Sequence, residues 1–337
     1  MTYHQIIDDI FDYCVELLII GARAIGMTYE EINVWFFIVF EPLVFALVAL
    51  YAWHLRSQNA QLRKQLEPIS HSTHGPDSGG TGYLVTLGLH SDSPEVRKWS
   101  IKHDSLPPMK VALFADFHFS TPSDLEMLST LKRQMIAENP DLVLFAGDYN
   151  GSHDLSDDVS RETVVKSLEA LAFPKPAFAV LGNHDNWDSN KAWTDAFDGS
   201  SIKLIENQID RITLNSVEFC VRGLGDIYSG YWQAVELPSE CADRVITLTH
   251  DPAGLLTPNA TVETLSFAGH THCGQIAFPL IGAPIVPTRA PKDMHCGQFD
   301  REGKGVVSGG LGSSIIPARF GPLTAPGWEL IDINSVN

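Results

Sequence analysis

The sequence predicts an α/β fold in which a layered β-sheet forms the core of the C-terminal part of the chain. From about residue 94 onward, short apolar runs of strand length alternate with segments typical of amphipathic helices. Most of these apolar runs also end on carboxylate, amide or imidazole side chains, as expected where the strands of an α/β sheet present functional groups. With 337 residues and a 44% hydrophobic content, the chain can bury a sizeable core.

The predicted elements follow one another in strand, helix, strand order. A strand at 95–103 comes first, and the near-continuous apolar run at 110–116 suits a second strand buried on both faces. A helical segment at 124–139 stops before Pro140, a residue that interrupts helices. The remaining predicted elements are a helix at 161–173 and strands at 141–148, 177–185, 244–251 and 265–276.

Three N-terminal segments precede the globular domain, which is expected at 94–337. Residues 1–33 mix apolar and acidic side chains and predict an amphipathic helix at a membrane interface. Residues 34–55 contain an apolar run long enough to cross a bilayer, with Trp35 and Trp53 at its ends. Glu41 and Pro42 within that run leave a monotopic or core helix as the alternative. Residues 56–93 have the Gly-, Ser- and Pro-containing composition of a flexible tether.

The charges that flank the predicted span indicate its orientation. Acidic residues precede it, whereas Arg56, Arg63 and Lys64 follow it. By the positive-inside rule, the globular domain is expected to face the cytoplasm from an anchor in the inner (cytoplasmic) membrane. The segment begins too late for an ordinary cleavable signal peptide, so it is expected to stay on the mature protein.

The net charge and the cysteines narrow the class of function. With 23 basic and 41 acidic residues the formal charge is −18, so no nucleic-acid partner is expected and an anionic substrate needs local positive charge. The five cysteines show no C-x-x-C pair, which predicts reduced thiols in a reducing compartment. Nothing in the sequence indicates the oligomeric state.

Five predicted strands end on potential metal ligands, namely Asp116 and His118; Asp148; Asn183, His184 and Asp185; His250; and His270 and His272. If the last segment is extended, His270 and His272 point to the same side and face one cavity. Taken alone, this H-x-H pair is equally well explained by a core histidine beside an exposed one. Five strand ends with the same chemistry favour a shared site.

The types of side chain in this set indicate the metal chemistry. Carboxylate, imidazole and amide groups without convergent thiolates suit Mn²⁺, Fe or Zn²⁺, and the number of ligands implies two divalent transition-metal ions. Two adjacent ions can clamp a phosphoryl group and lower the pKa of a water that attacks it. The ions would also supply the positive charge that the chain as a whole lacks.

The ordered set D-x-H, G-D, G-N-H-D, H and G-H-x-H resembles the calcineurin-like metallophosphoesterases over about residues 105–337. The resemblance implies a metallophosphoesterase-type β-sandwich flanked by helices. It implies one metal held by Asp116, His118 and His272, a second held by Asn183, His250 and His270, and Asp148 as the bridge between them. It further implies that His184 is the proton donor or charge stabiliser and that Asp185 orients it.

Other stretches refine the resemblance. The C-terminal sequence is similar to the bacterial membrane-associated branch of the family, which includes UDP-diacylglucosamine pyrophosphohydrolases of lipid A synthesis. The Arg and Glu found in the protein Ser/Thr phosphatases are missing beside the G-D and G-N-H-D motifs, which argues against that activity. Cys273 is expected to be a packed thiol that points away from the histidines, and Arg289 and Arg319 to be solvated rather than bound to substrate.

The expected function is that of a membrane-anchored, metal-dependent phosphoesterase. The bond it cleaves would be a phosphodiester or a pyrophosphate of a phosphate-containing substrate, with a lipid-linked nucleotide as the leading example. The alternative is a membrane-tethered scaffold that binds metal without turnover.

Overall fold

The computed structural model describes residues 94–120, 122–151, 159–241, 244–256, 265–278, 282–300, 304–314, 318–321 and 323–335, together with 85–87 and scattered positions between 15 and 35. The chain divides into two compact units, Met1–Gly79 and Gly80–Asn337. Apart from Trp35, the predicted membrane span at 34–55 lies outside the described residues. The helices formed by the described residues include none that is long and apolar enough to span a bilayer.

In the N-terminal unit the described residues at 15, 19, 20, 22, 31 and 32 are helical, and one helix start is defined by its hydrogen bonds. The backbone N–H of Thr28 donates to the Glu31 carboxylate at 2.9 Å, and the N–H of Glu31 donates to the Thr28 hydroxyl at 3.1 Å. This reciprocal pair is a capping box, which satisfies donors that a helix start leaves open. The rest of the segment predicted as an interfacial helix, 1–33, lies almost wholly outside the described residues.

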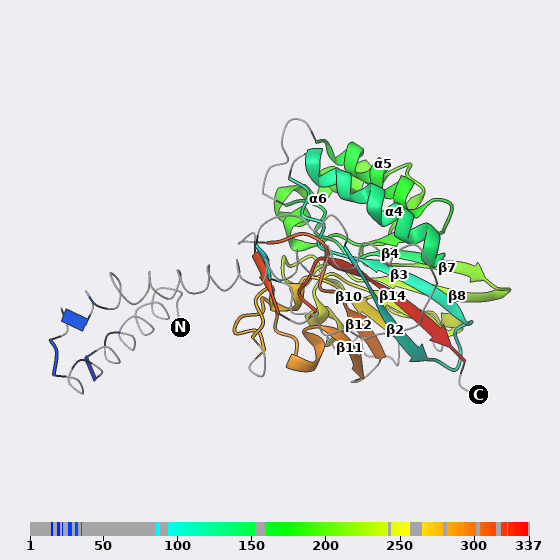
Figure 1. The fold of residues 1–337 in the computed structure, drawn as a ribbon. Helices are drawn as coiled ribbons and strands as arrows, with labels where there is room; N and C mark the ends of the chain where they lie inside the picture. The colour runs from blue at the N-terminus through cyan, green and yellow to red at the C-terminus, as the bar shows by residue number, and fades with distance from the viewer. Residues whose placement is uncertain are drawn as a thin grey trace, which may run out of the picture. The chain divides into compact units, whose positions relative to one another are not determined.

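The first of two six-stranded sheets has the strand order β2-β14-β3-β4-β5-β6. Its strands are β2 (Glu95–Lys102), β3 (Met109–Phe114), β4 (Leu142–Phe145), β5 (Ala177–Ala179), β6 (Ile202–Leu204) and β14 (Gly327–Asn334). β3 to β6 run parallel, while β14 is antiparallel to β3 and parallel to β2. The helices α4 (Met127–Glu138), α5 (Arg161–Ala172) and α6 (Asn183–Phe197) lie together beside this sheet (Figure 1).

The second six-stranded sheet has the order β11-β12-β10-β9-β8-β7. Its strands are β7 (Gln208–Leu214), β8 (Val217–Gly223), β9 (Val245–Leu248), β10 (Leu265–Ala268), β11 (Gly297–Asp300) and β12 (Lys304–Val307). β8, β9, β10 and β12 are parallel, and β7 and β11 are antiparallel edge strands. Short 3-10 turns occur at Pro122–Glu126, Ser239–Cys241, Pro252–Leu256, His272–Gly274 and Lys292–Met294.

The two faces of β3 show why its sequence is apolar throughout. Val111 and Leu113 belong to a core shared with β8, β9 and β10 of the second sheet, whereas Ala112 and Phe114 pack with residues of α4, α5 and α6. Because alternate residues of a strand point to opposite faces, a strand between a sheet and a helix layer needs apolar residues at every position. The predicted β-sandwich flanked by helices is confirmed.

A third, two-stranded sheet lies within the segment predicted as a tether. β1 (Val85–Leu87) pairs antiparallel with β13 (Ala318–Phe320). These three residues form a paired strand, and the other residues of 56–93 lie outside the described part of the chain.

Two disulfides correct the prediction of reduced thiols. Cys220, at the middle of β8, is bonded to Cys241, and Cys273 is bonded to Cys296, with Cα–Cα separations of 5.6 and 4.8 Å. Both separations lie in the normal range for disulfides. Neither pair is recognisable in the sequence, because the partners are 21 and 23 residues apart and meet only through the fold.

Candidate metal centre

Seven predicted ligands gather where the two sheets present the C-terminal ends of their parallel strands. Asp116 and His118 follow β3, Asp148 follows β4, Asn183 follows β5, His250 follows β9, and His270 and His272 follow β10. The C-terminal ends of parallel neighbours lie at the same edge of a sheet, so both sheets deliver these residues to one region. One hydrogen bond links the sheets directly, since the backbone N–H of His270 donates to the Asp116 carboxylate at 3.0 Å.

The backbone at these strand ends turns sharply. Five of the ligand candidates have positive φ angles between 49° and 68°, namely Asp116, His118, Asp148, His270 and His272. This left-handed region is uncommon for residues other than glycine and is concentrated at functional sites. Gly147 and Gly182 permit a close approach beside Asp148, because a Cβ on Gly147 would lie 2.4 Å from the Gly182 nitrogen.

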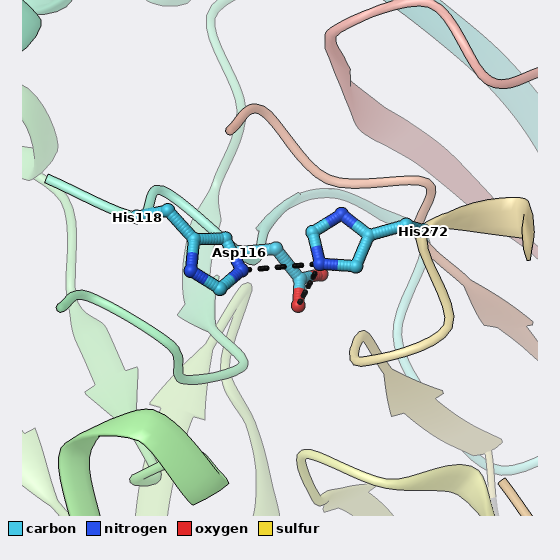
Figure 2. A group of neighbouring side chains, drawn as sticks. All are labelled: Asp116, His118 and His272. Atoms are coloured by element: carbon cyan, nitrogen blue, oxygen red, sulfur yellow. Dashed lines mark hydrogen bonds and ion pairs between the residues drawn. The ribbon is translucent and has the colours of Figure 1, made fainter. Parts of the chain in front are cut away.

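One group of donors consists of Asp116, His118 and His272 (Figure 2). The Nε2 atoms of His118 and His272 lie 3.1 Å apart, and His272 Nε2 lies 3.6 Å from the Asp116 carboxylate. All three residues are buried, and their donor atoms lie within 4.8 Å of one another. Such a close approach of imidazole nitrogens and a carboxylate suits a shared cation.

Asp148 belongs to two further groups, one with His118 and His184 and the other with His250 and His270. Its Oδ2 lies 3.3 Å from His250 Nε2 and 3.6 Å from His118 Nε2. His118 also belongs to the first group, so Asp148 connects the two ends of the site. This position agrees with the predicted bridging role, which stays a prediction. The sequence assignment separates His184 from the metal ligands, yet His184 lies in one donor group with His118 and Asp148.

The outer hydrogen bonds of two histidines leave one ring nitrogen of each for a metal. His250 Nδ1 lies 2.6 Å from the carbonyl oxygen of Ala146, and His270 Nε2 lies 2.5 Å from that of Pro287. A carbonyl can only accept, so these nitrogens carry the hydrogens. When the rings are neutral, the other nitrogens, which lie 3.2 Å apart, present lone pairs. Asn183 adds an amide oxygen 3.2 Å from His250 Nε2.

Arg319 gives His272 a different outer partner. Its guanidinium donates to His272 Nδ1 at 2.8 Å and to the carbonyl oxygens of Gly309, Thr324 and Gly312. Arg319 is 2% exposed, so the prediction of a solvated side chain was wrong, whereas Arg289 is exposed as predicted. Because Nδ1 accepts this bond, a neutral His272 carries its hydrogen on Nε2 and must release it to bind a metal there.

Burial sets the charge states of the group. It lowers the pKa of His118 to about 3 and, together with Arg319, lowers the pKa of His272 well below its usual value. Burial raises the pKa of Asp116 to about 7. For Asp148 the opposing effect of burial is overcome by His250, which lowers the pKa of Asp148 and has its own pKa raised in return. A neutral His118 and an ionised Asp148 suit metal binding, whereas His250 must release a proton to bind an ion.

Asp185 lies under the Asp148 loop. Its carboxylate oxygens accept four backbone N–H groups at 2.9 to 3.0 Å, those of Gly182, Asp148, Tyr149 and Asn150. Burial and the nearby Asp148 carboxylate raise the pKa of Asp185 to about 8, against the hydrogen bonds from Gly182 and Asn150. The four donors use both side-chain oxygens of Asp185 as acceptors. None of these bonds goes to the His184 ring, so this geometry supports the Asp148 loop directly.

The basis of the H-x-H prediction was wrong although both histidines reach the site. β10 ends at Ala268, and His272 begins a 3-10 turn. The two side chains converge through two left-handed residues and not through the alternation of an extended segment. Cys273 is buried as predicted but is a disulfide partner and not a thiol.

The comparisons with known proteins agree with this geometry. Residues 109–274 match the model of the calcineurin-like phosphoesterase family. The chain is 30% identical to the Escherichia coli phosphodiesterase YaeI over 187 residues, which are 55% of this chain and 68% of YaeI. The chain belongs to the calcineurin-like phosphoesterase family. It is also 27% identical to the Bacillus subtilis metallophosphoesterase YkuE over 268 residues, 77% of this chain and 91% of YkuE.

Further matches are more distant. A Danio rerio protein described as a transmembrane protein with a metallophosphoesterase domain is 26% identical over 224 residues, 59% of this chain and 49% of that protein. The solved structure of the calcineurin-like phosphoesterase YfkN from Bacillus subtilis has a TM-score of 0.38 and 14% identity, covering 60% of this chain and 82% of that one. Family members typically bind two divalent metals, and the clustered donors of this calcineurin-like phosphoesterase fit such ions.

Proposed function

We propose that this chain is a phosphodiesterase that uses two divalent transition-metal ions, Mn²⁺, Fe or Zn²⁺, to cleave a phosphodiester or pyrophosphate bond. The observation that carries the proposal is that Asp148 shares donor groups with histidines from both sheets, and His184 lies within one of those groups. Such ions supply charge neutralisation at a phosphoryl group and acidification of water. The relative YaeI, described as a phosphodiesterase, supports a diester as the substrate.

Two contacts support the proposal that His184 acts on the leaving group. Its backbone N–H donates to Asp148 at 2.9 Å at the start of α6, and its ring lies 4.7 Å from the ring of His118. A protonated imidazole there would stabilise charge on the phosphoryl oxygens and give a proton to the departing oxygen. The membership of His184 in a donor group makes metal ligation the competing role.

The test compares metal content and turnover in the same preparations. The chelator-stripped protein is reloaded with Mn²⁺, bound metal is counted by mass spectrometry, and bis-p-nitrophenyl phosphate hydrolysis is followed. We expect two ions per chain, and we expect His184→Ala to keep both while kcat falls by about 10²- to 10⁴-fold. The loss should be smaller for p-nitrophenyl than for alkyl leaving groups, because p-nitrophenolate needs less protonation. His103→Ala, outside the donor groups, is the matched control.

The outcomes separate the alternatives. Loss of one ion in His184→Ala would make His184 a ligand and transfer the acid role elsewhere. Two bound ions without hydrolysis of phosphodiesters or pyrophosphates would favour the metal-binding scaffold.

The proposal extends to the membrane. An anchor at 34–55 would hold the enzyme at the inner membrane, where lipid-linked nucleotides, the substrate class of the UDP-diacylglucosamine pyrophosphohydrolase branch, are concentrated. Basic residues after the anchor favour the cytoplasmic face, whereas the two disulfides favour an oxidising compartment. The oxidation state of the cysteines in the native membrane fraction distinguishes these two orientations.

A further inference from the structure

Two half-exposed aromatic side chains stand at the rim of the metal centre. Trp187 is 47% exposed and Tyr228 is 51% exposed, and their ring centroids lie 5.9 Å apart with an interplanar angle of 60°. Large aromatic rings that remain exposed beside a reactive site are candidates for ligand contact, because burying them against a ligand removes apolar surface from water.

These rings lie against His184, the predicted proton donor, and His270, a predicted metal ligand. The Trp187 ring lies 5.4 Å from the ring of His184, and the Tyr228 ring lies 4.9 Å from the ring of His270. His184 and His270 belong to the two donor groups that share Asp148. The aromatic pair therefore lies beside both of the donor groups that contain Asp148.

The main chain presents Trp187 on the same face as His184. Both lie in the first turns of α6, and a spacing of three residues aligns side chains on a helix surface. Ser189, with a non-helical φ of −171°, interrupts α6 just after Trp187. The short segment before this break thus carries both the predicted acid and the exposed indole.

A hydrogen bond between their chain neighbours links the segments that carry the two aromatic side chains. Asn186, the neighbour of Trp187, donates from its side-chain nitrogen to the hydroxyl of Ser229, the neighbour of Tyr228, at 2.9 Å. The Ser229 backbone N–H and hydroxyl both donate to the buried Asp226 carboxylate, at 2.7 and 2.6 Å. Holding both rings before a ligand arrives reduces the ordering cost of binding.

We propose that Trp187 and Tyr228 form a subsite that stacks a planar aromatic group of the substrate, of the kind a nucleobase provides. This rests on the proposed function and specifies its substrate class. Two aromatic faces suit a flat heteroaromatic ring better than a flexible alkyl chain. Stacking also provides affinity without positive charge, which matters in a chain of net charge −18 that repels anions.

The test uses two ligands that carry the same phosphate. AMP and ribose 5-phosphate are titrated as competitive inhibitors of the Mn²⁺-loaded full chain, and their equilibrium binding is measured by calorimetry. We expect AMP to bind about 5- to 150-fold more tightly, the range that stacking of one base supplies. Trp187→Ala and Tyr228→Ala should each move this ratio towards one and leave ribose 5-phosphate binding unchanged. Trp187→Phe should retain most of the preference because it keeps a ring.

One control variant and three possible results decide whether the aromatic subsite exists. Ile136→Ala, an exposed apolar side chain on α4, should alter neither ligand. A wild-type ratio of one, with hydrolysis of bis-p-nitrophenyl phosphate intact, would overturn the subsite and leave the phosphodiesterase standing. Equal weakening of both ligands in Trp187→Ala would show that the ring supports the metal centre and would also overturn the subsite. If neither phosphate binds and no diester is cleaved, the proposed function fails together with the subsite.

Discussion

Replacing Asp185 with Asn tests whether this side chain supports the metal loop or orients His184. In the structure two carboxylate oxygens accept four buried backbone N–H groups, those of Gly182, Asp148, Tyr149 and Asn150. An amide has a single oxygen, so the variant can satisfy two of these donors at most. A buried donor without an acceptor costs about 1–3 kcal/mol, so two of them should lower the free energy of unfolding by about 2–6 kcal/mol.

The assay is equilibrium unfolding in urea with chelator present, so that metal binding does not add to the measured stability. Asp195→Asn is the matched control, since it makes the same chemical change on the same helix. Asp195 is 64% exposed and pairs with Lys191 four residues earlier, so its loss should change the free energy of unfolding by less than about 0.5 kcal/mol.

The two roles for Asp185 predict different stabilities for the Asp185→Asn variant. If Asp185 acts mainly by orienting His184, Asp185→Asn should unfold like the Asp195 control and lose only kcat. That result would refute the argument from the four N–H groups. A loss of several kcal/mol would show that Asp185 holds the loop that carries Asp148, and catalysis would then fall through the position of Asp148.

Two further predictions follow from the cysteines and from the buried acid. Protein taken from its native membrane fraction and denatured without reductant should show one titratable thiol, that of Cys14, out of five cysteines; five thiols would contradict both disulfides and favour the cytoplasmic orientation. Metal affinity of the stripped protein should rise from pH 6 to pH 8, and binding should release protons. The pKa of Asp116 is raised to about 7 and that of His250 is also raised, so both groups hold protons that a metal must displace. Affinity that does not change over this range, measured by calorimetry in buffers of different ionisation enthalpy, would contradict these charge states.

The sequence predicted most of the residues that the structure brings together in the candidate site, because the pattern that marks them is local. An apolar run that ends on Asp116 or Asp148 indicates both a strand and the functional group that follows it. Parallel strands bring such ends to one edge of a sheet. The two-sided burial of β3 was also readable, since its apolar run leaves no polar face. These inferences need only the order of residues and the geometry of a strand.

The features that the sequence missed depend on contacts between distant segments. Arg319 follows the predicted ligands by many residues, yet it is buried against His272 at 2.8 Å. The pairing of Cys273 with Cys296 likewise needs the turn after β10 and the loop before β11 to meet. Trp187 stood in the sequence beside the G-N-H-D motif, and its spacing from His184 was the one available signal of the aromatic rim.

The strained backbone explains why the ligands and the fold depend on one another. Five ligand candidates occupy the left-handed region, which costs a residue other than glycine about 1 kcal/mol or more. Together this is about 5 kcal/mol, comparable to the whole stability of a small domain, so the packed strands on either side must over-determine these turns. An ion that binds only the folded chain offsets such strain through mass action. A sheet edge built only for stability would place glycine, or an ordinary turn, at the positions of Asp116, Asp148 and His270. We infer that these residues are kept for the geometry of the metal ligands.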